Sequence, residues 1–128
     1  MKIAGYFETI KDRLLIASFV ADFKISKMVD RSKNGHFRAR LTFIDNSQLE
    51  FSEFVEQNAD DEIAVVTYSY HWSNENDHFI RRWDNALHYP KLKNFPHHIH
   101  VKEDDVISGK PIDIFGVLDE IGKALENS

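Results

Sequence analysis

The chain has 128 residues, 42% of them hydrophobic, with no cysteine and a formal net charge of −5 at pH 7. This size and composition predict one domain, residues 1–128, that buries a core without disulfide or metal support. The lack of cysteine excludes thiolate catalysis and cysteine zinc sites, and the net negative charge argues against a protein that coats nucleic acid indiscriminately.

The first half of the chain predicts one helix followed by three strands. Apolar residues at helical spacing predict an amphipathic helix over about the first 14 residues. Apolar and polar residues then alternate in 19–26, 36–44 and 48–55, which predicts strands. We expect a tight hairpin turn at Asn34-Gly35, because both residue types tolerate the positive φ that such a turn needs.

The second half predicts two more strands, a loop and a helix. Residues 63–72 are rich in β-branched and aromatic side chains, and 78–84 alternate, so both segments predict strands. Residues 85–105 contain two prolines and no sustained period, which predicts a long structured loop, with a short edge strand at 98–101 as an alternative. We expect the last helix to have Pro111 in its first turn.

Short connections between the strands imply antiparallel neighbours. The expected fold class is therefore α+β: an N-terminal helix, an antiparallel meander sheet of about five strands, the long structured loop, and a C-terminal helix packed on the sheet. Charged residues interrupt the N-terminal segment, and no apolar run approaches the ~20 residues of a membrane span. We expect a soluble cytoplasmic protein that does not engage a membrane.

Charge is segregated along the chain. Residues 1–40 hold nine Lys or Arg against four acids, and 80–102 hold five against one. Residues 41–79 hold no base against nine acids, and 103–128 hold two against seven. If the sheet brings the two basic blocks to one side, a basic face suited to phosphate results. The alternative is that the blocks mix as ordinary salt-bridging surface.

Six of the seven histidines and both tryptophans lie between His71 and His100. Histidine can give and take a proton near neutral pH, and arginine stabilises the charge that builds on a scissile phosphate. Aromatic rings can stack on unpaired bases. Metal-free RNA cleavage needs little more than these groups. The residues that we assign are His71, His97, His98, Arg81 and Arg82 for catalysis, with Trp72, Trp83, Asn85, His88 and His100 for RNA binding.

Two other interpretations of this segment stay open. His98 and His100 would point the same way on a strand and, with His88 or Asp84, could hold a metal, although no strong ligand spacing such as HExxH is present. The histidines could instead be hydrogen-bonded loop staples and the tryptophans core residues. We favour a functional site over a structural role, because proton-transfer groups cluster at functional sites. We expect that site to hold no cofactor, because no strong metal-ligand spacing is present.

Glu53 interrupts the apolar face of the third expected strand. We expect it to be a solvated strand residue or a partner of Arg38 or Arg40 across the hairpin, with a catalytic part as the less favoured alternative.

Three segments together resemble the TumE family: Tyr68–Trp72, Arg82–Ala86 with His88 and Pro90, and Phe95–Val101. The resemblance extends more weakly to the hairpin from Phe37 to Val55 and to the C-terminal helix. The family usually has a proline where Leu87 stands and a lysine where Ile99 stands. The missing lysine puts a phosphate-binding role for residue 99 in doubt and leaves the neighbouring histidines unaffected.

The resemblance implies the toxin half of a prokaryotic toxin–antitoxin pair, encoded beside a helix-turn-helix antitoxin of the Xre type. Our leading hypothesis is a toxin that cleaves RNA without a metal. The alternatives are a non-enzymatic toxin that binds a cellular protein and a metal-dependent nuclease or hydrolase. Acidic segments 41–79 and 103–128 are candidate antitoxin contacts, with Glu50 and Glu56 as test positions. A homodimer is a further candidate assembly.

Overall fold

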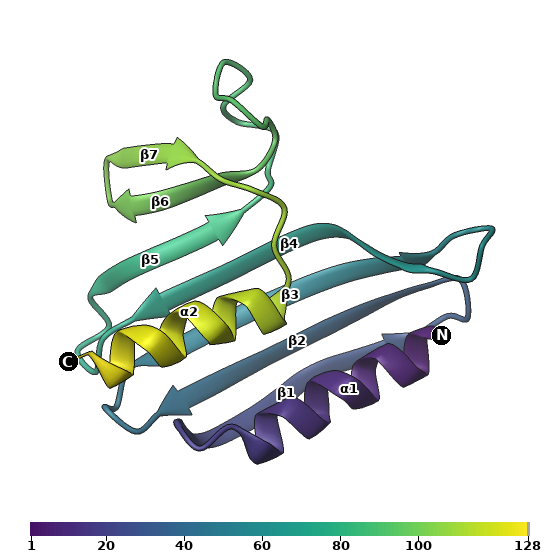
Figure 1. The fold of residues 1–128 in the computed structure, drawn as a ribbon, viewed down its shortest axis with the longest axis horizontal. Helices are drawn as coiled ribbons and strands as arrows, with labels where there is room; N and C mark the ends of the chain where they lie inside the picture. The colour runs from purple at the N-terminus through teal and green to yellow at the C-terminus, as the bar shows by residue number, and fades with distance from the viewer. Residues whose placement is uncertain (128) are drawn as a thin grey trace.

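A computed structural model describes residues 1–127 as two helices and one antiparallel sheet of seven strands (Figure 1). The strands neighbour one another in chain order, so the sheet is a simple meander. The elements are α1 (Ile3–Ile16), β1 (Val20–Asp30), β2 (Asn34–Phe43), β3 (Gln48–Gln57), β4 (Ile63–Ser73), β5 (Phe79–Asp84), β6 (His98–Lys102), β7 (Asp105–Ser108) and α2 (Ile114–Glu126). The expected α+β class is confirmed, with a sheet larger than the five strands expected.

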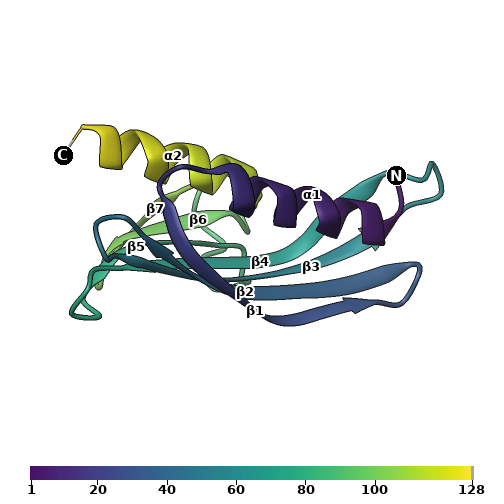
Figure 2. The ribbon, with the colours of Figure 1, turned by 90° about the horizontal axis from the view of Figure 1, so that it is seen from below.

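Both helices pack on the same face of the sheet, which we call the covered face (Figure 2). Side chains alternate between the two faces, so β2 buries Phe37, Ala39 and Leu41 beneath the helices and exposes Arg38 and Arg40 on the opposite side. That opposite side, which we call the open face, has neither helix upon it.

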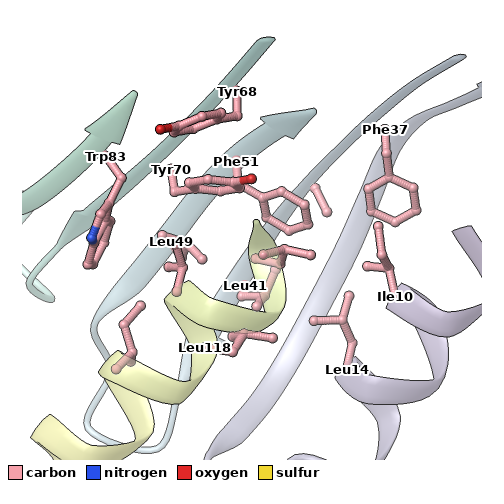
Figure 3. Packing of buried hydrophobic residues seen from close by; sticks show 14 of the residues in the cluster. Ile10, Leu14, Phe37, Leu41, Leu49, Phe51, Tyr68, Tyr70, Trp83 and Leu118 are labelled. Atoms are coloured by element: carbon pink, nitrogen blue, oxygen red, sulfur yellow. The ribbon is translucent and has the colours of Figure 1, made fainter. Parts of the chain in front are cut away.

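The core between helices and sheet is aromatic and tightly interlocked (Figure 3). The rings of Phe7 and Phe37 lie 5.3 Å apart between centroids, and those of Tyr68 and Tyr70 lie 5.2 Å apart. Each side chain of this size stabilises the fold by about 1.5–3 kcal/mol when fully buried. Covered-face positions are therefore committed to packing, which leaves the open face for chemistry.

The first hairpin turns earlier than expected. Asn34 and Gly35 belong to β2, and the reversal occurs at residues 31–33, where Ser32 has a φ of 66°. No glycine in residues 1–127 has a positive φ. Gly35 serves close approach instead, because a Cβ there would lie 2.6 Å from the carbonyl oxygen of Val29 and 2.9 Å from Ile3 Cγ2. The prediction of a turn at Asn34-Gly35 was wrong, because the chain reverses before these residues and both belong to β2.

The expected loop of residues 85–105 is shorter, because the chain re-enters the sheet at β6. The strand considered at 98–101 is confirmed, but it is not an edge strand, because β7, which the sequence did not predict, pairs with its other side. Helix α2 begins at Ile114, so Pro111 precedes it. Asp113 caps the helix by accepting a hydrogen bond from Gly116 N at 3.0 Å. Within residues 1–127, neither helix is long and apolar enough to cross a membrane.

Candidate functional site on the open face

The strand register places one ionisable side chain from each of six neighbouring strands in a single row on the open face. We call this the ionisable row. Successive members are direct partners in the β-ladders. Strands are ~4.8 Å apart, so the row spans about 24 Å. In order from β1 to β6, its members are Lys24, Arg40, Glu50, His71, Arg82 and His100.

The β4 to β6 end of this row has the composition of an acid–base site. Arg82 is the ladder partner of His71 on one side and of His100 on the other, so an arginine position lies between two histidine positions. The two histidines are two strands apart, or ~10 Å between backbones. His71 is exposed and the His100 side chain keeps 18% of its surface accessible. A phosphate bound to Arg82 would therefore have one ring on each flank.

Asp84, in the next row, contacts two members of this group, Arg82 and His100. Its buried carboxylate places Oδ2 3.0 Å from Arg82 Nε and 3.5 Å from His100 Nε2. The negative charge favours a proton on His100 Nε2, which leaves Nδ1 to accept another. Burial nevertheless lowers the pKa of His100, against the opposing effect of Asp84, and so favours the neutral ring.

His98 is buried beside Asp84. Its Nδ1 lies 2.9 Å from the carbonyl oxygen of Pro96, and since a carbonyl only accepts, that nitrogen carries the proton. In the neutral ring Nε2 therefore presents a lone pair. It lies 2.7 Å from Asp84 Oδ1 but lacks hydrogen-bond alignment, and it has no hydrogen-bond partner within residues 1–127. The ring of Tyr89 packs against His98 at 4.8 Å and His100 at 5.9 Å.

His97 faces the opposite way from His98. Its Nδ1 lies 2.8 Å from the Tyr68 hydroxyl, beside Ile112 and Asp113 on the covered side. Burial, followed by the charge of Asp84, raises the pKa of Tyr68 to about 12, so the phenol keeps its proton and donates it. Burial also lowers the pKa of His97. The imidazoles of residues 71, 97 and 98 therefore do not share one cleft, and His97 is not brought to the other two.

The residues expected to bind RNA lie mostly elsewhere. Trp72 and Trp83 are buried in the core, and Trp72 Nε1 donates to Ser47 Oγ at 3.0 Å, so no ring face is left for a base. The stacking assignment for both is corrected for that reason. Asn85 accepts a hydrogen bond from Tyr68 N at 3.0 Å and donates to Val66 O at 2.9 Å, which staples it to β4.

Arg81 and His88 also lie away from the row. Arg81 lies over the ring of Trp83 at 5.9 Å, on the covered side of β5. His88 is exposed in the loop before β6. Of the ten assigned residues, the structure therefore brings together His71, Arg82, His98 and His100, with Asp84 between them.

An aromatic surface does exist on the open face, at a residue that the sequence reasoning did not single out. Phe54 is 45% exposed and stacks on His36 with ring centroids 3.9 Å apart. The sequence does indicate that Phe54 lies on this face, because Leu49, Phe51 and Val55 point into the core and alternation directs Phe54 to the other side. Tyr89, which covers His98, carried no comparable signal.

A shallow groove follows the row from its basic end. Lys24, Lys27, Arg38, Arg40 and Glu50 line its first part. Arg38 and Glu50 also line the second part, together with Ser69, His71 and Arg82, so the depressions are continuous. Members of both basic blocks thus reach the open face, as the charge pattern allowed.

One acid lies among these bases. Glu50 binds Arg38 and Arg40, and these two hydrogen bonds lower its pKa. Its charge is therefore neutralised locally, and Glu50 is not the free acidic contact that we expected for an antitoxin. The expectation of ordinary salt-bridging surface holds at this point of the sheet.

Glu53 contradicts both expectations for it, because its side chain is buried on the covered face. It accepts hydrogen bonds from the hydroxyls of Tyr6 and Tyr70, each at 2.6 Å, and from Ile114 N at 2.8 Å. The last contact places a carboxylate at the N-terminus of α2, where the helix dipole favours it. Glu53 joins both helices to the sheet and takes no part in the open-face site.

Comparison with protein-family models places the chain in a family. A protein-family model described as Toxin TumE matches residues 8–127. No curated protein and no solved structure matches the chain. The match covers every strand of the sheet and, apart from Tyr6, the side chains just described on the open and the covered face.

Proposed function

Because the chain belongs to the TumE toxin family, which implies a cognate antitoxin, we propose that it inhibits growth by cleaving RNA on the open face of its sheet. The reaction is endoribonuclease cleavage that needs no metal. The observation that carries the proposal is the arrangement of Arg82 between His71 and His100 on adjacent strands.

Each side chain has one role in the proposed reaction. His100, oriented through Nε2 by Asp84, takes the proton of the 2′-hydroxyl, which then attacks the adjacent phosphorus. His71 protonates the departing 5′-oxygen, and Arg82 stabilises the charge on the phosphorane. Asp84 is a positioning residue, because it touches His100 and Arg82 and lies too deep to meet RNA.

The remainder of the row would hold the strand being cut. Lys24, Arg38 and Arg40 supply cations along the groove, and a span of about 24 Å suits the shortest sites of ~4 nucleotides that small single-strand binding folds use. Phe54, stacked on His36, offers a ring face to an unpaired base. Cleavage through a 2′-hydroxyl makes RNA the substrate and excludes DNA.

We propose that the partner is a helix-turn-helix antitoxin of the Xre type and that the toxin acts in the cytoplasm. The proposal is supported by the resemblance of Tyr68–Trp72, Arg82–Ala86 and Phe95–Val101 to the family.

The test is cleavage of a labelled single-stranded RNA by purified, chelator-treated protein. His71→Ala and His100→Ala should each lower the rate by about 10²–10⁴-fold, as loss of a general acid or base does. His97→Ala is the matched control, because this imidazole lies on the covered side, and its rate should stay near that of the wild type.

An intact protein that cuts no RNA, with or without added divalent metal, would overturn the proposal. Growth inhibition that persists in a variant without cleavage would favour a toxin that acts by binding a cellular protein. Cleavage lost equally in His97→Ala would mean that the open face is not the site.

A further inference from the structure

We propose that Asp84, His98 and His100 form a binding site for one divalent transition-metal ion, with Zn²⁺ as the best match. One ligand atom from each residue lies within 4.8 Å of the others. Two imidazoles and one carboxylate are a donor set that zinc uses at sites with an open fourth position. The competition with RNA cleavage described below rests on the proposed function, whereas binding itself does not.

The sheet register builds this triad. His98 is the direct partner of Asp84 across β5 and β6, and His100 is two residues further along the same strand. Residues two apart on a strand share a face, so both rings are directed to the same side as the carboxylate. The ring centroids of His98 and His100 are 5.0 Å apart. A regular ladder therefore fixes all three ligands without a loop.

His98 is prepared as a ligand. The Pro96 carbonyl takes the proton on Nδ1 and so leaves the lone pair of Nε2 directed into the site. A backbone carbonyl in this role is the common outer partner of metal-bound histidines. The side chain of His98 is 1% exposed, and Nε2 has no aligned hydrogen-bond partner in residues 1–127. A buried nitrogen of this kind costs stability unless something fills its place.

Asp84 has a lone pair to offer an ion. Arg82 Nε lies 3.0 Å from Oδ2, and Oδ1 accepts a hydrogen bond from Ala86 N at 3.1 Å. The second lone pair of Oδ1, which lies 2.7 Å from His98 Nε2, is the one available as a ligand. Tetrahedral coordination with metal–ligand distances of ~2.0–2.2 Å requires these two atoms to separate by roughly 0.6–0.9 Å, which a rotation of either side chain can supply. Arg82 opposes a second cation, but through Oδ2 it also orients the carboxylate.

The surroundings would exclude water on one side and admit it on the other. The ring of Tyr89 packs on His98 and His100 and closes the site. His100 keeps 18% of its side-chain surface accessible, toward the open face where RNA would lie. We therefore expect the fourth position on the side of His100, which is the one partly exposed ligand.

A bound ion would occupy two groups that the proposed RNA cleavage needs. His100 would lose the nitrogen that Asp84 orients, and Asp84 would be shared with the metal. We therefore expect the metal-bound form to cleave RNA more slowly than the metal-free form. Metal binding would then regulate the same site.

The experiment is titration of chelator-treated protein with Co²⁺, read by the visible absorption of the four-coordinate ion, followed by displacement with Zn²⁺. We expect one ion per chain. His98→Ala and His100→Ala should each weaken binding by more than the 10–100-fold that loss of an outer partner costs. His71→Ala is the matched control, because this exposed histidine lies outside the triad, and it should bind as the wild type does.

No stoichiometric binding, or binding unchanged in both His98→Ala and His100→Ala, would overturn the site. Because His98 is buried, the thermal midpoint of each variant is measured, and His100→Ala, at a partly exposed position, decides if His98→Ala does not fold. RNA cleavage by the metal-free and Zn²⁺-loaded protein separates the two proposals. Co²⁺ binding without any cleavage would support the metal site and overturn the proposed function, and cleavage that requires the metal would overturn the competition.

Discussion

Hydrogen-bond donors from three different elements contact the buried carboxyl group of Glu53. The hydroxyl of Tyr6 comes from α1, that of Tyr70 from β4 and the amide of Ile114 from α2. Burial raises the pKa of Glu53, although all three hydrogen bonds act in the opposite direction. Burial of Glu53 therefore has a desolvation cost, and its three hydrogen bonds connect both helices to the sheet.

This balance predicts how stability depends on pH. With its pKa raised above the ordinary 4.5, Glu53 holds a proton in the folded chain that the unfolded chain has already released. Its contribution to stability is therefore full below pH 4.5 and is lost as pH rises through the folded pKa. The loss amounts to about 1.4 kcal/mol for each unit by which the pKa is raised.

Glu53→Gln should remove this pH dependence, because the amide does not ionise. The measurement is the urea midpoint of both proteins between pH 4.5 and 8, and the quantity of interest is the difference between them. Burial lowers the pKa values of His36, His97 and His100, which makes stability rise with pH in both proteins and cancels in that difference. A difference that does not vary with pH would contradict the raised pKa.

The sequence could place Glu53 on a face but could not identify its partners. Glu53 lies at every second position with Leu49, Phe51 and Val55 and so shares their face, and the pattern alone assigns its side chain to the buried side. A carboxylate among apolar residues is normally exposed, and that general rule led to the surface assignment. Tyr6 is 47 positions away, a pairing that only the tertiary structure reveals.

At the scale of elements, the β1–β2 hairpin depends on the absence of a side chain at Gly35. Gly35→Ala should destabilise the fold by about 1–3 kcal/mol, because its Cβ would meet the backbone oxygen of Val29 at 2.6 Å. Gly5→Ala is the matched control, since its nearest contact would be Met1 Cγ at 3.5 Å in a helix that prefers alanine.

Chemical denaturation of the two variants measures this prediction. Gly5→Ala should be neutral or stabilising by up to about 1 kcal/mol. An equal loss of stability in both variants would show that close approach at Gly35 is not the cause.

Strong periodicity made most elements predictable. Alternation over residues 36–44 and 48–55 gave β2 and β3 close to their true limits, and apolar spacing gave both helices. Strand β7 was missed because a segment of four residues, itself beginning with an aspartate, provides too little alternation to recognise. The first turn was misplaced because Asn34-Gly35 is a strong local signal that tertiary packing of Gly35 overrides.

At the scale of the whole molecule, the sheet packs both helices on one face and carries the ionisable row on the other. Within the segment from His71 to His100, the structure brings four of the predicted site residues to the open face: His71, Arg82, His98 and His100. Which of its residues face the same way depends on register across three strands, and sequence alone does not fix that register. His97 was grouped with His98 because residues 85–105 were expected to form a loop, where side chains need not alternate, and His100 was assigned only to binding.

Arg81 and Arg82 provide the most direct test of the account, because they are neighbours on β5 with guanidinium groups on opposite faces. Arg82 lies on the open face between His71 and His100, and Arg81 lies over Trp83 on the covered side. The measurement is growth inhibition on induced expression of Arg81→Gln and Arg82→Gln, at matched abundance and thermal midpoint. Arg82→Gln should lose inhibition and Arg81→Gln should keep it. Full inhibition by Arg82→Gln, or its loss in Arg81→Gln alone, would contradict the claim that the open face carries the toxin's activity.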